Sequence, residues 1–223
     1  MIFVSFFFSI GVIIMLYEIL FFFSIFIVLD LCLRIEQKTK YFAIHIFANL
    51  LTMYVCFDEI IYGLANPLEL YVKPTHFYGY YLMIALHLYH MIFHSLDRND
   101  IFHHLLFVLF GCGWALYFQP YIVSSLPLLA LHGFPGAMDY TSLILYKYGK
   151  IDKLQQKKFS ANVNLWFRGP YALLISGMAF VSLFEQKRYE CLPCVLLVIF
   201  NGLYYMNSTA MSYANAMHEA NKN

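Results

Sequence analysis

The sequence predicts an all-α protein, a polytopic transmembrane bundle of about seven helices. Of the 223 residues, 61% are hydrophobic and 20% aromatic, but only 12% are charged, about half the charged fraction of a soluble domain. The apolar residues also gather in runs as long as the roughly 20 residues that a bilayer requires. The net charge of +1, without a long basic run, gives no indication of nucleic-acid binding.

Seven apolar segments follow one another along the chain. The first carries Glu18 and lacks the positive n-region and small-residue cleavage pattern of a signal peptide, so we expect it to be retained. In the fifth, Gly133 and Pro135 predict a kink or break near residues 133–136, because proline removes a backbone donor. The predicted spans are about Ile2–Leu31, Tyr41–Leu64, Thr75–Leu96, Ile101–Phe118, Tyr121–Tyr148, Ala161–Phe184 and Cys191–Tyr213.

These spans suggest three parts: a first span with its polar loop (1–40), a helical domain (41–215) and a short tail (216–223). Lys and Arg are unevenly distributed between the two sides of the membrane, and the side with more of them is expected to be cytosolic. The N-terminus is therefore predicted in the lumen or outside, and the tail in the cytosol. The cytosolic side holds Arg34, Lys38, Lys40, Arg98, Lys147, Lys150, Lys153, Lys157, Lys158 and Lys222, and the opposite side holds Lys73, Lys187 and Arg188.

The stretch HLYHMIFHSLDRNDIFHH holds five of the nine histidines. His87, His90 and His94 fall at i, i+3 and i+7, so we expect them on one face of a helix, and His103 and His104 open the next segment. Ionisable groups inside a bilayer are costly and tend to mark functional sites. The alternative is that they are interface histidines of an aromatic-rich membrane protein.

Polar side chains of six segments are expected at a similar depth near the cytosolic face, given a rise of about 1.5 Å per residue. A lone charge in hydrocarbon is costly, so we expect Asp139 to pair with Arg168, either to fix two helices together or to shape a site. The other members of this layer are His45, Asn49, His90, His94, His103, His104, Asn164, Asn207, Ser208 and Thr209.

Two kinds of chemistry fit the histidines. His103 or His104 is a candidate general base that takes a proton from an amine or hydroxyl as it attacks a thioester. Asp100, four residues before His104, would orient that ring, cap the helix, or do both. The second possibility is a metal site that adds His90, His94 and a nearby aspartate. It is weaker, because adjacent histidines on a helix point about 100° apart, and no cofactor is assigned with certainty.

The stretch DRNDIFHHLLFVLFG resembles the Asp-x-x-His-His signature of TLC-domain membrane proteins, the group that includes the ceramide synthases. The segments LHGFPGAMDYTSLILYKYG and NVNLWFRGP resemble the later part of that domain, where a kinked Pro-Gly span precedes a span that opens with Asn and Arg. The resemblance covers roughly residues 41–215. It implies a TLC-like bundle around a lipid-accommodating cavity, usually in endoplasmic-reticulum-like membranes.

In ceramide synthases the matching histidine pair is implicated in acyl transfer from acyl-CoA to a sphingoid base, which points to His103 and His104 here. Two functions are therefore expected. The first is binding, transport or regulation of membrane lipids, and the second is lipid acyl transfer with acyl-CoA as co-substrate. A metal-dependent lipid hydrolase or hydroxylase is a distant third. The residues expected to contact the lipid are His90, His94, Asp139, Asn164 and Arg168.

Overall fold

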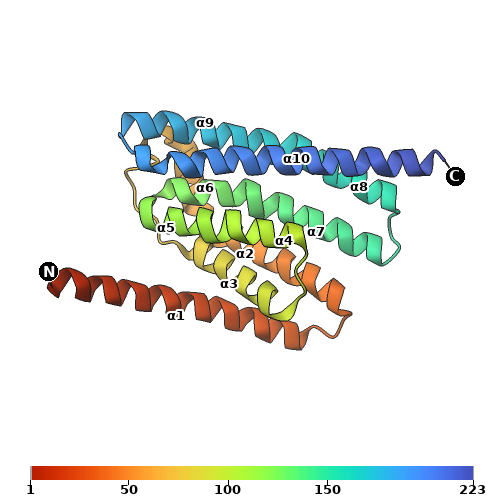
Figure 1. The fold of residues 1–223 in the computed structure, drawn as a ribbon, viewed down its shortest axis with the longest axis horizontal. Coiled ribbons are helices and arrows are strands. Elements are labelled where there is room, and N and C mark those ends of the chain that lie inside the picture. The colour runs from red at the N-terminus through yellow and green to blue at the C-terminus, as the bar shows by residue number, and fades with distance from the viewer. Residues whose placement is uncertain (1, 223) are drawn as a thin grey trace.

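The computed structural model describes the backbone of residues 2–222 and, within this range, the side chains of residues 11–37 and 39–222. Met1 and Asn223, the ends of two predicted ranges, lie outside the described residues. Within residues 2–222 the chain is all helical and contains no β-strand, as the sequence predicts. The helices run back and forth along one axis, and the two termini lie at opposite ends of the molecule (Figure 1). The uninterrupted long helices are α1 (Ile2–Cys32), α2 (Gln37–Ala65), α3 (Tyr78–Phe93) and α10 (Leu192–Ala220).

The remaining segments are composite, because π-helical turns interrupt them. Such turns change the direction in which side chains point and are frequent at functional sites. The first composite segment joins α4 (Arg98–His103), the π-helical η2 (His104–Cys112) and α5 (Gly113–Phe118). The second joins η3 (Ile122–Ser124), α6 (Ser125–Leu128), the π-helical η4 (Leu129–Gly133) and α7 (Phe134–Lys147). The third joins α8 (Lys153–Val163), the π-helical η5 (Asn164–Arg168) and α9 (Gly169–Glu185). Two short 3-10 turns, η1 (Pro67–Glu69) and η6 (Tyr189–Cys191), lie outside these segments.

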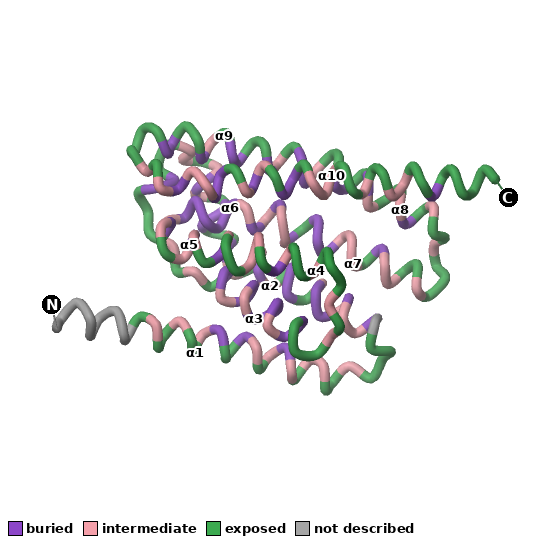
Figure 2. The backbone as a smooth tube through the Cα atoms, viewed as in Figure 1, coloured by how far each residue is buried: buried purple, intermediate pink, exposed green. Residues whose placement is uncertain are grey.

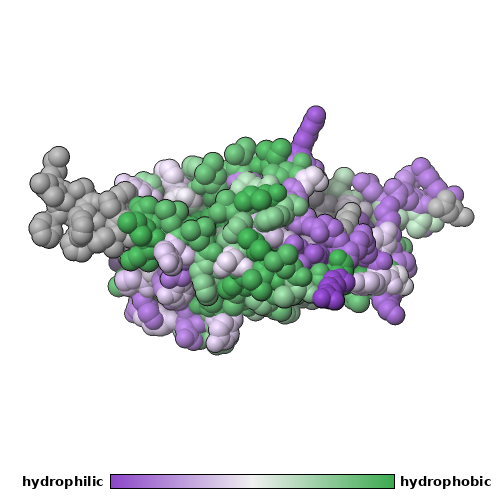
Figure 3. Space-filling model, turned by 90° about the horizontal axis from the view of Figure 1, so that it is seen from below, coloured by the Kyte–Doolittle hydropathy of each residue, from purple (hydrophilic) through white to green (hydrophobic). Residues whose placement is uncertain are grey.

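Within the part of the chain that the structure describes, five helical segments are long and apolar enough to cross a membrane: Gly11–Cys32, Thr39–Ala65, Arg98–Phe118, Lys153–Glu185 and Tyr189–Ala220. Each coincides with one of the predicted spans. Helix α3, with 16 residues, is shorter than the roughly 20 that a full crossing requires. Figure 3 shows apolar residues across the middle of one face and hydrophilic residues toward its ends, most of them near the C-terminus. The chain therefore has the surface of a membrane protein.

The third predicted span, Thr75–Leu96, is too long at both ends. Phe77 adopts a left-handed conformation with φ of 60°, which delays the start of the helix. At the other end His94 is extended, with φ of −130° and ψ of 151°. His94 therefore lies just past the helix, although its ring centroid stays 5.8 Å from that of His90. The predicted helical alignment of three histidines is wrong for the third.

Capping boxes set two other boundaries earlier than the apolar pattern predicts. Asp97 and Asp100 exchange side-chain and backbone hydrogen bonds at the start of α4, so the N-cap is Asp97 rather than Asp100. Asp152 and Gln155 do the same for α8, which makes a helix of residues expected in a polar loop. Helix α10 also continues to Ala220, so the predicted tail is largely helical.

The predicted break in the fifth segment is confirmed at Gly133, where η4 ends with φ of −38° and ψ of −104° and α7 begins with Pro135 in its first turn. At the next turn α7 lies very close to α2. A Cβ atom on Gly136 would lie 2.7 Å from Asn49 Nδ2, so a larger residue at this position would force the Asn49 side chain to shift. The break and the contact place His132 and Asp139 beside the polar residues of α2.

Apolar side chains fill the bundle unevenly. One buried cluster, including Phe26, Leu82 and Tyr89, joins α1 to α3, and α1 itself stays at the periphery (Figure 2). Another, including Ile122 and Leu183, packs the end of the bundle that holds η3 and η6. Neither cluster fills the opposite end, between the starts of α2, α4 and α8, where polar side chains gather instead.

Candidate functional site

Polar side chains from six helical segments line a chamber of about 420 Å³ near the loop between α3 and α4. This volume is within the range of small-molecule sites, about 300–1,000 Å³. The polar lining comprises Tyr41, His45 and Asn49 of α2, His87 and His90 of α3, Asn99, Asp100, His103 and His104 of α4 and η2, His132, Asp139 and Tyr140 of η4 and α7, Gln156, Lys157, Ser160 and Arg168 of α8 and η5, and Tyr205, Ser208, Thr209 and Ser212 of α10.

Each of the three π-helical segments contributes to the chamber. His104 is the first residue of η2, His132 lies in η4, and Arg168 ends η5. A π-helical turn reorients the side chains on either side of it relative to a regular helix. The local irregularities of the fold are therefore concentrated at the residues that line the chamber.

His103 is the centre of a hydrogen-bonded relay. His87 Nδ1 lies 2.7 Å from the Met83 carbonyl oxygen, so it carries a proton, and His87 Nε2 must then accept. His103 Nε2, 3.0 Å away, is the donor to His87 Nε2. His103 Nδ1 is left to accept from the Tyr205 hydroxyl at 3.1 Å. The chain Tyr205–His103–His87–Met83 thus fixes the tautomers of two neutral histidines.

His104 differs from its neighbour, because its ring is not part of the relay. Its Nδ1 atom is buried and has no hydrogen-bond partner among residues 2–222. The ring centroids of His87 and His90 lie 5.0 and 5.1 Å away. Asp100 lines the same chamber, but its carboxylate accepts a hydrogen bond from the backbone N–H of Asp97. Of the histidine pair, His104 therefore has the ring nitrogen with no protein partner.

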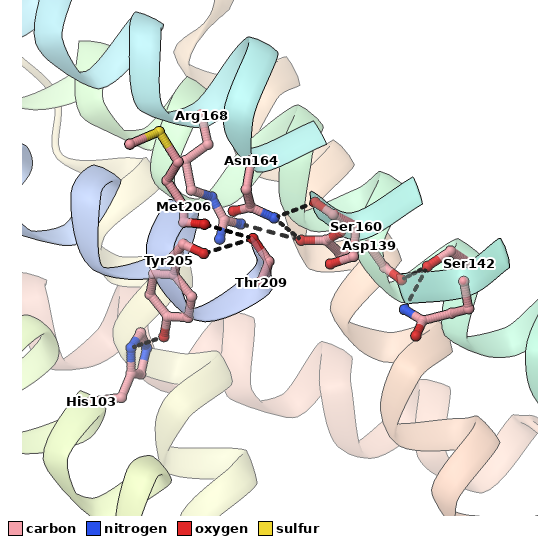
Figure 4. Close-up of polar contacts among 10 residues, drawn as sticks. His103, Asp139, Ser142, Ser160, Asn164, Arg168, Tyr205, Met206 and Thr209 are labelled. Carbon is pink, nitrogen blue, oxygen red and sulfur yellow. Dashed lines mark hydrogen bonds and ion pairs between the residues drawn. The ribbon is translucent and has the colours of Figure 1, made fainter. Parts of the chain in front are cut away.

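The expected partnership of Asp139 with Arg168 is present in the structure. Arg168 Nη2 lies 3.9 Å from Asp139 Oδ2, and Asn164 Nδ2 donates to the same oxygen at 3.2 Å (Figure 4). Asn164 also donates to the Ser160 carbonyl oxygen at 2.8 Å, which holds it against its own helix. The guanidinium of Arg168 lies over the Tyr205 ring, 4.9 Å from its centroid. Three predicted residues from α7 and η5 thus form one polar wall.

The sequence prediction and the chamber differ in several members. His94 caps α3 and packs on Tyr41, with ring centroids 4.9 Å apart, but it does not line the chamber. His132 and Tyr205 do line it and were missed. His132 immediately precedes the predicted break, which is the one feature of the sequence that marks it. Tyr205 is one of 19 tyrosines, and nothing in its local sequence distinguishes it.

A second, apolar cavity of about 110 Å³ adjoins the polar chamber. The two share His103, Leu131 and His132 as lining residues. Beyond these, the cavity is surrounded mainly by apolar side chains of η2, α6, α9 and α10, among them Phe107, Leu126, Ile175, Val195 and Val198. A single ligand with a polar head and an apolar portion therefore matches both spaces.

Among residues 2–222, no group of three or more His, Cys, Asp or Glu side chains is arranged to hold a metal ion. Comparisons with protein-family models, with curated proteins and with solved structures find no match to this chain.

Proposed function

We propose that this chain is a multi-pass membrane protein of TLC type that binds a lipid in an intramembrane cavity, in order to transport lipids or regulate membrane composition. The observation that supports this proposal is that a polar chamber of about 420 Å³ and an apolar cavity of about 110 Å³ are neighbours that share His103, Leu131 and His132 as lining residues. A lipid headgroup would occupy the chamber, and the adjacent methylenes would enter the apolar cavity, where contact with water is avoided.

The membrane arrangement is part of the proposal. Helix α3 and the segment from η3 to α7 would complete a seven-span bundle with the five longer segments, with the N-terminus in the lumen of an endoplasmic-reticulum-like membrane and the tail in the cytosol. Protease protection of chains tagged at either terminus tests this orientation. Digestion of both tags in sealed vesicles would refute an odd number of crossings.

Mass spectrometry of lipids that copurify with the full chain tests the binding function. We expect a stoichiometric lipid in the wild type and altered lipid occupancy in the His103→Ala/His104→Ala variant. Gly177→Ala, a helical position where an added Cβ meets nothing within 4 Å, is the control that should keep the lipid. Wild-type protein that carries no lipid after reconstitution in native-lipid vesicles would overturn the proposal.

A second candidate function is acyl transfer from acyl-CoA to an amine or hydroxyl acceptor, and the unpartnered ring nitrogen of His104 favours it. His104, with an unpartnered ring nitrogen, would take the acceptor's proton as the acceptor's nitrogen or oxygen attacks the thioester carbonyl. The carbon–sulfur bond then breaks, and the CoA thiolate leaves with the proton. The Tyr205 hydroxyl, which donates to His103 Nδ1 in the structure, would turn its one proton to the carbonyl oxygen that becomes negative in this step.

Adding long-chain acyl-CoA to the same preparations separates the two functions. An acylated lipid formed by the wild type but not by the His103→Ala/His104→Ala variant would establish the transferase. A bound lipid that remains chemically unchanged in both would leave the binding function alone, with the histidines as lining residues of the cavity.

A further inference from the structure

We propose that the wall of the chamber formed by α8, η5 and α10 binds the phosphate group of an amphiphile, with Arg168 and Lys157 as its two cationic contacts. This inference rests on the proposed lipid-binding function and specifies the chemistry of the headgroup. It concerns the chamber alone and holds whether the protein carries its ligand unchanged or reacts with it.

The first argument is the state of Arg168. Only 6% of this residue is exposed, and its Nε atom is buried without a hydrogen-bond partner among residues 2–222. Its one ion pair, to Asp139, is 3.9 Å long, which exceeds hydrogen-bond distance. A guanidinium has five N–H donors in a planar fork, and a buried one normally uses them. Arg168 therefore presents donors to the chamber that no protein group accepts.

The second argument is the asymmetry between the charges that line the chamber. Both carboxylates accept hydrogen bonds from the protein: Asp139 from the Asn164 amide, and Asp100 from the backbone of its capping box. Both cations, Arg168 and Lys157, line the chamber, and neither forms a hydrogen bond within the described part of the chain. Asp139 Oδ1 is also buried without a partner among the described residues. The asymmetry is therefore that each carboxylate has at least one hydrogen bond from the protein, whereas neither cation has any from that part of the chain.

The third argument is the composition of the wall around these cations. Ser160 of α8 and Ser208 and Ser212 of α10 also line the chamber. Figure 4 shows the guanidinium of Arg168 extending from η5 toward Asp139 and the Tyr205 ring of α10. Arginine binds phosphate oxygens in pairs and lysine adds a point charge, whereas hydroxyls donate to the remaining oxygens. A carboxylate has only two oxygens, so a phosphate makes fuller use of this set.

The fourth argument is the position of the wall relative to the apolar cavity. The cavity and the chamber share His103, Leu131 and His132 as lining residues, and the relay links His103 to Tyr205, whose ring lies 4.9 Å from the guanidinium of Arg168. A phosphate bound at Arg168 would therefore lie two side-chain contacts, through Tyr205 and His103, from the apolar cavity that His103 lines. A phospholipid, a lysophospholipid or an acyl-CoA contains both parts, whereas inorganic phosphate contains only the first.

The test measures binding of three probes to the full chain in nanodiscs of neutral lipid: phosphatidic acid, diacylglycerol with the same chains, and inorganic phosphate. We expect phosphatidic acid to bind about tenfold or more tightly than diacylglycerol, because a charge-assisted pair adds roughly that factor. Arg168→Gln should reduce the preference to less than about threefold, and Lys157→Gln should reduce it partly. Lys158→Gln, an exposed neighbour that does not line the chamber, should keep it.

Each outcome decides one point. Equal binding of phosphatidic acid and diacylglycerol by the wild type overturns the phosphate inference and leaves lipid binding intact, whereas binding of neither lipid overturns both proposals. Inorganic phosphate that binds as tightly as phosphatidic acid, and is lost in Lys157→Gln, supports the phosphate contacts and assigns them to a soluble ligand. An undiminished preference in a folded Lys157→Gln variant overturns the two-cation site even if Arg168→Gln fails to fold.

Discussion

The Asp139–Arg168 pair gives a stability prediction that can be derived from its geometry. At 3.9 Å, two unit charges attract by about 4 kcal/mol at an effective dielectric constant of about 20, and by about 1 kcal/mol in bulk water. The Arg168 side chain is only 7% exposed and that of Asp139 19%, so the pair lies between these limits. Asp139→Asn keeps the side-chain shape but leaves a buried guanidinium unpaired, and we expect it to lose about 2–4 kcal/mol of unfolding free energy.

The assay is reversible unfolding of the purified chain in mixed micelles, followed by helical circular dichroism. The double variant Asp139→Asn/Arg168→Gln should recover more than half of the loss, because it removes the unpaired charge as well. Glu219→Gln is the matched control, since Glu219 pairs with Lys153 at 2.7 Å on the exposed surface and its loss should not be measurable. A loss no greater than that of the control would refute the reasoning and show that water fully screens the pair.

Three further predictions follow from other contacts. Nitrogen-15 NMR should find His87 protonated at Nδ1 and His103 protonated at Nε2. Tyr205→Phe should shift the His103 Nδ1 resonance alone. A reversed tautomer in either ring would contradict the relay. Gly136→Val should lower stability by about 1–3 kcal/mol in the micelle assay, because its Cβ would meet Asn49 at 2.7 Å, whereas Gly177→Ala should be neutral. Glu59→Leu should lower the free energy of unfolding by about 2–4 kcal/mol, because the buried carboxylate accepts hydrogen bonds from the Thr75 and Ser125 hydroxyls and the His76 backbone. Equal melting curves for variant and wild type would disprove that role.

The helical fold and part of the site could be predicted from the sequence for physical reasons. Apolar runs long enough to cross a bilayer indicate a membrane protein. The contact between Asp139 and Arg168 was predictable because a lone charge buried in hydrocarbon is costly. The position of His94 was not predictable from helical periodicity, because its extended backbone depends on how the following loop is capped. Tyr205 was missed because in a chain with 19 tyrosines residue type alone carries little information, and only the fold brings it to His103.

The chamber is difficult to explain as architecture alone. Among residues 2–222, its lining leaves six buried polar atoms without a protein partner, two from Asn49 and one each from His104, His132, Asp139 and Arg168. Each such group costs about 1–3 kcal/mol when nothing else satisfies it, and a bundle selected only for stability would place apolar side chains there. Three π-helical segments and a glycine contact instead turn polar residues toward one space. The most economical explanation is that a polar ligand head completes these hydrogen bonds.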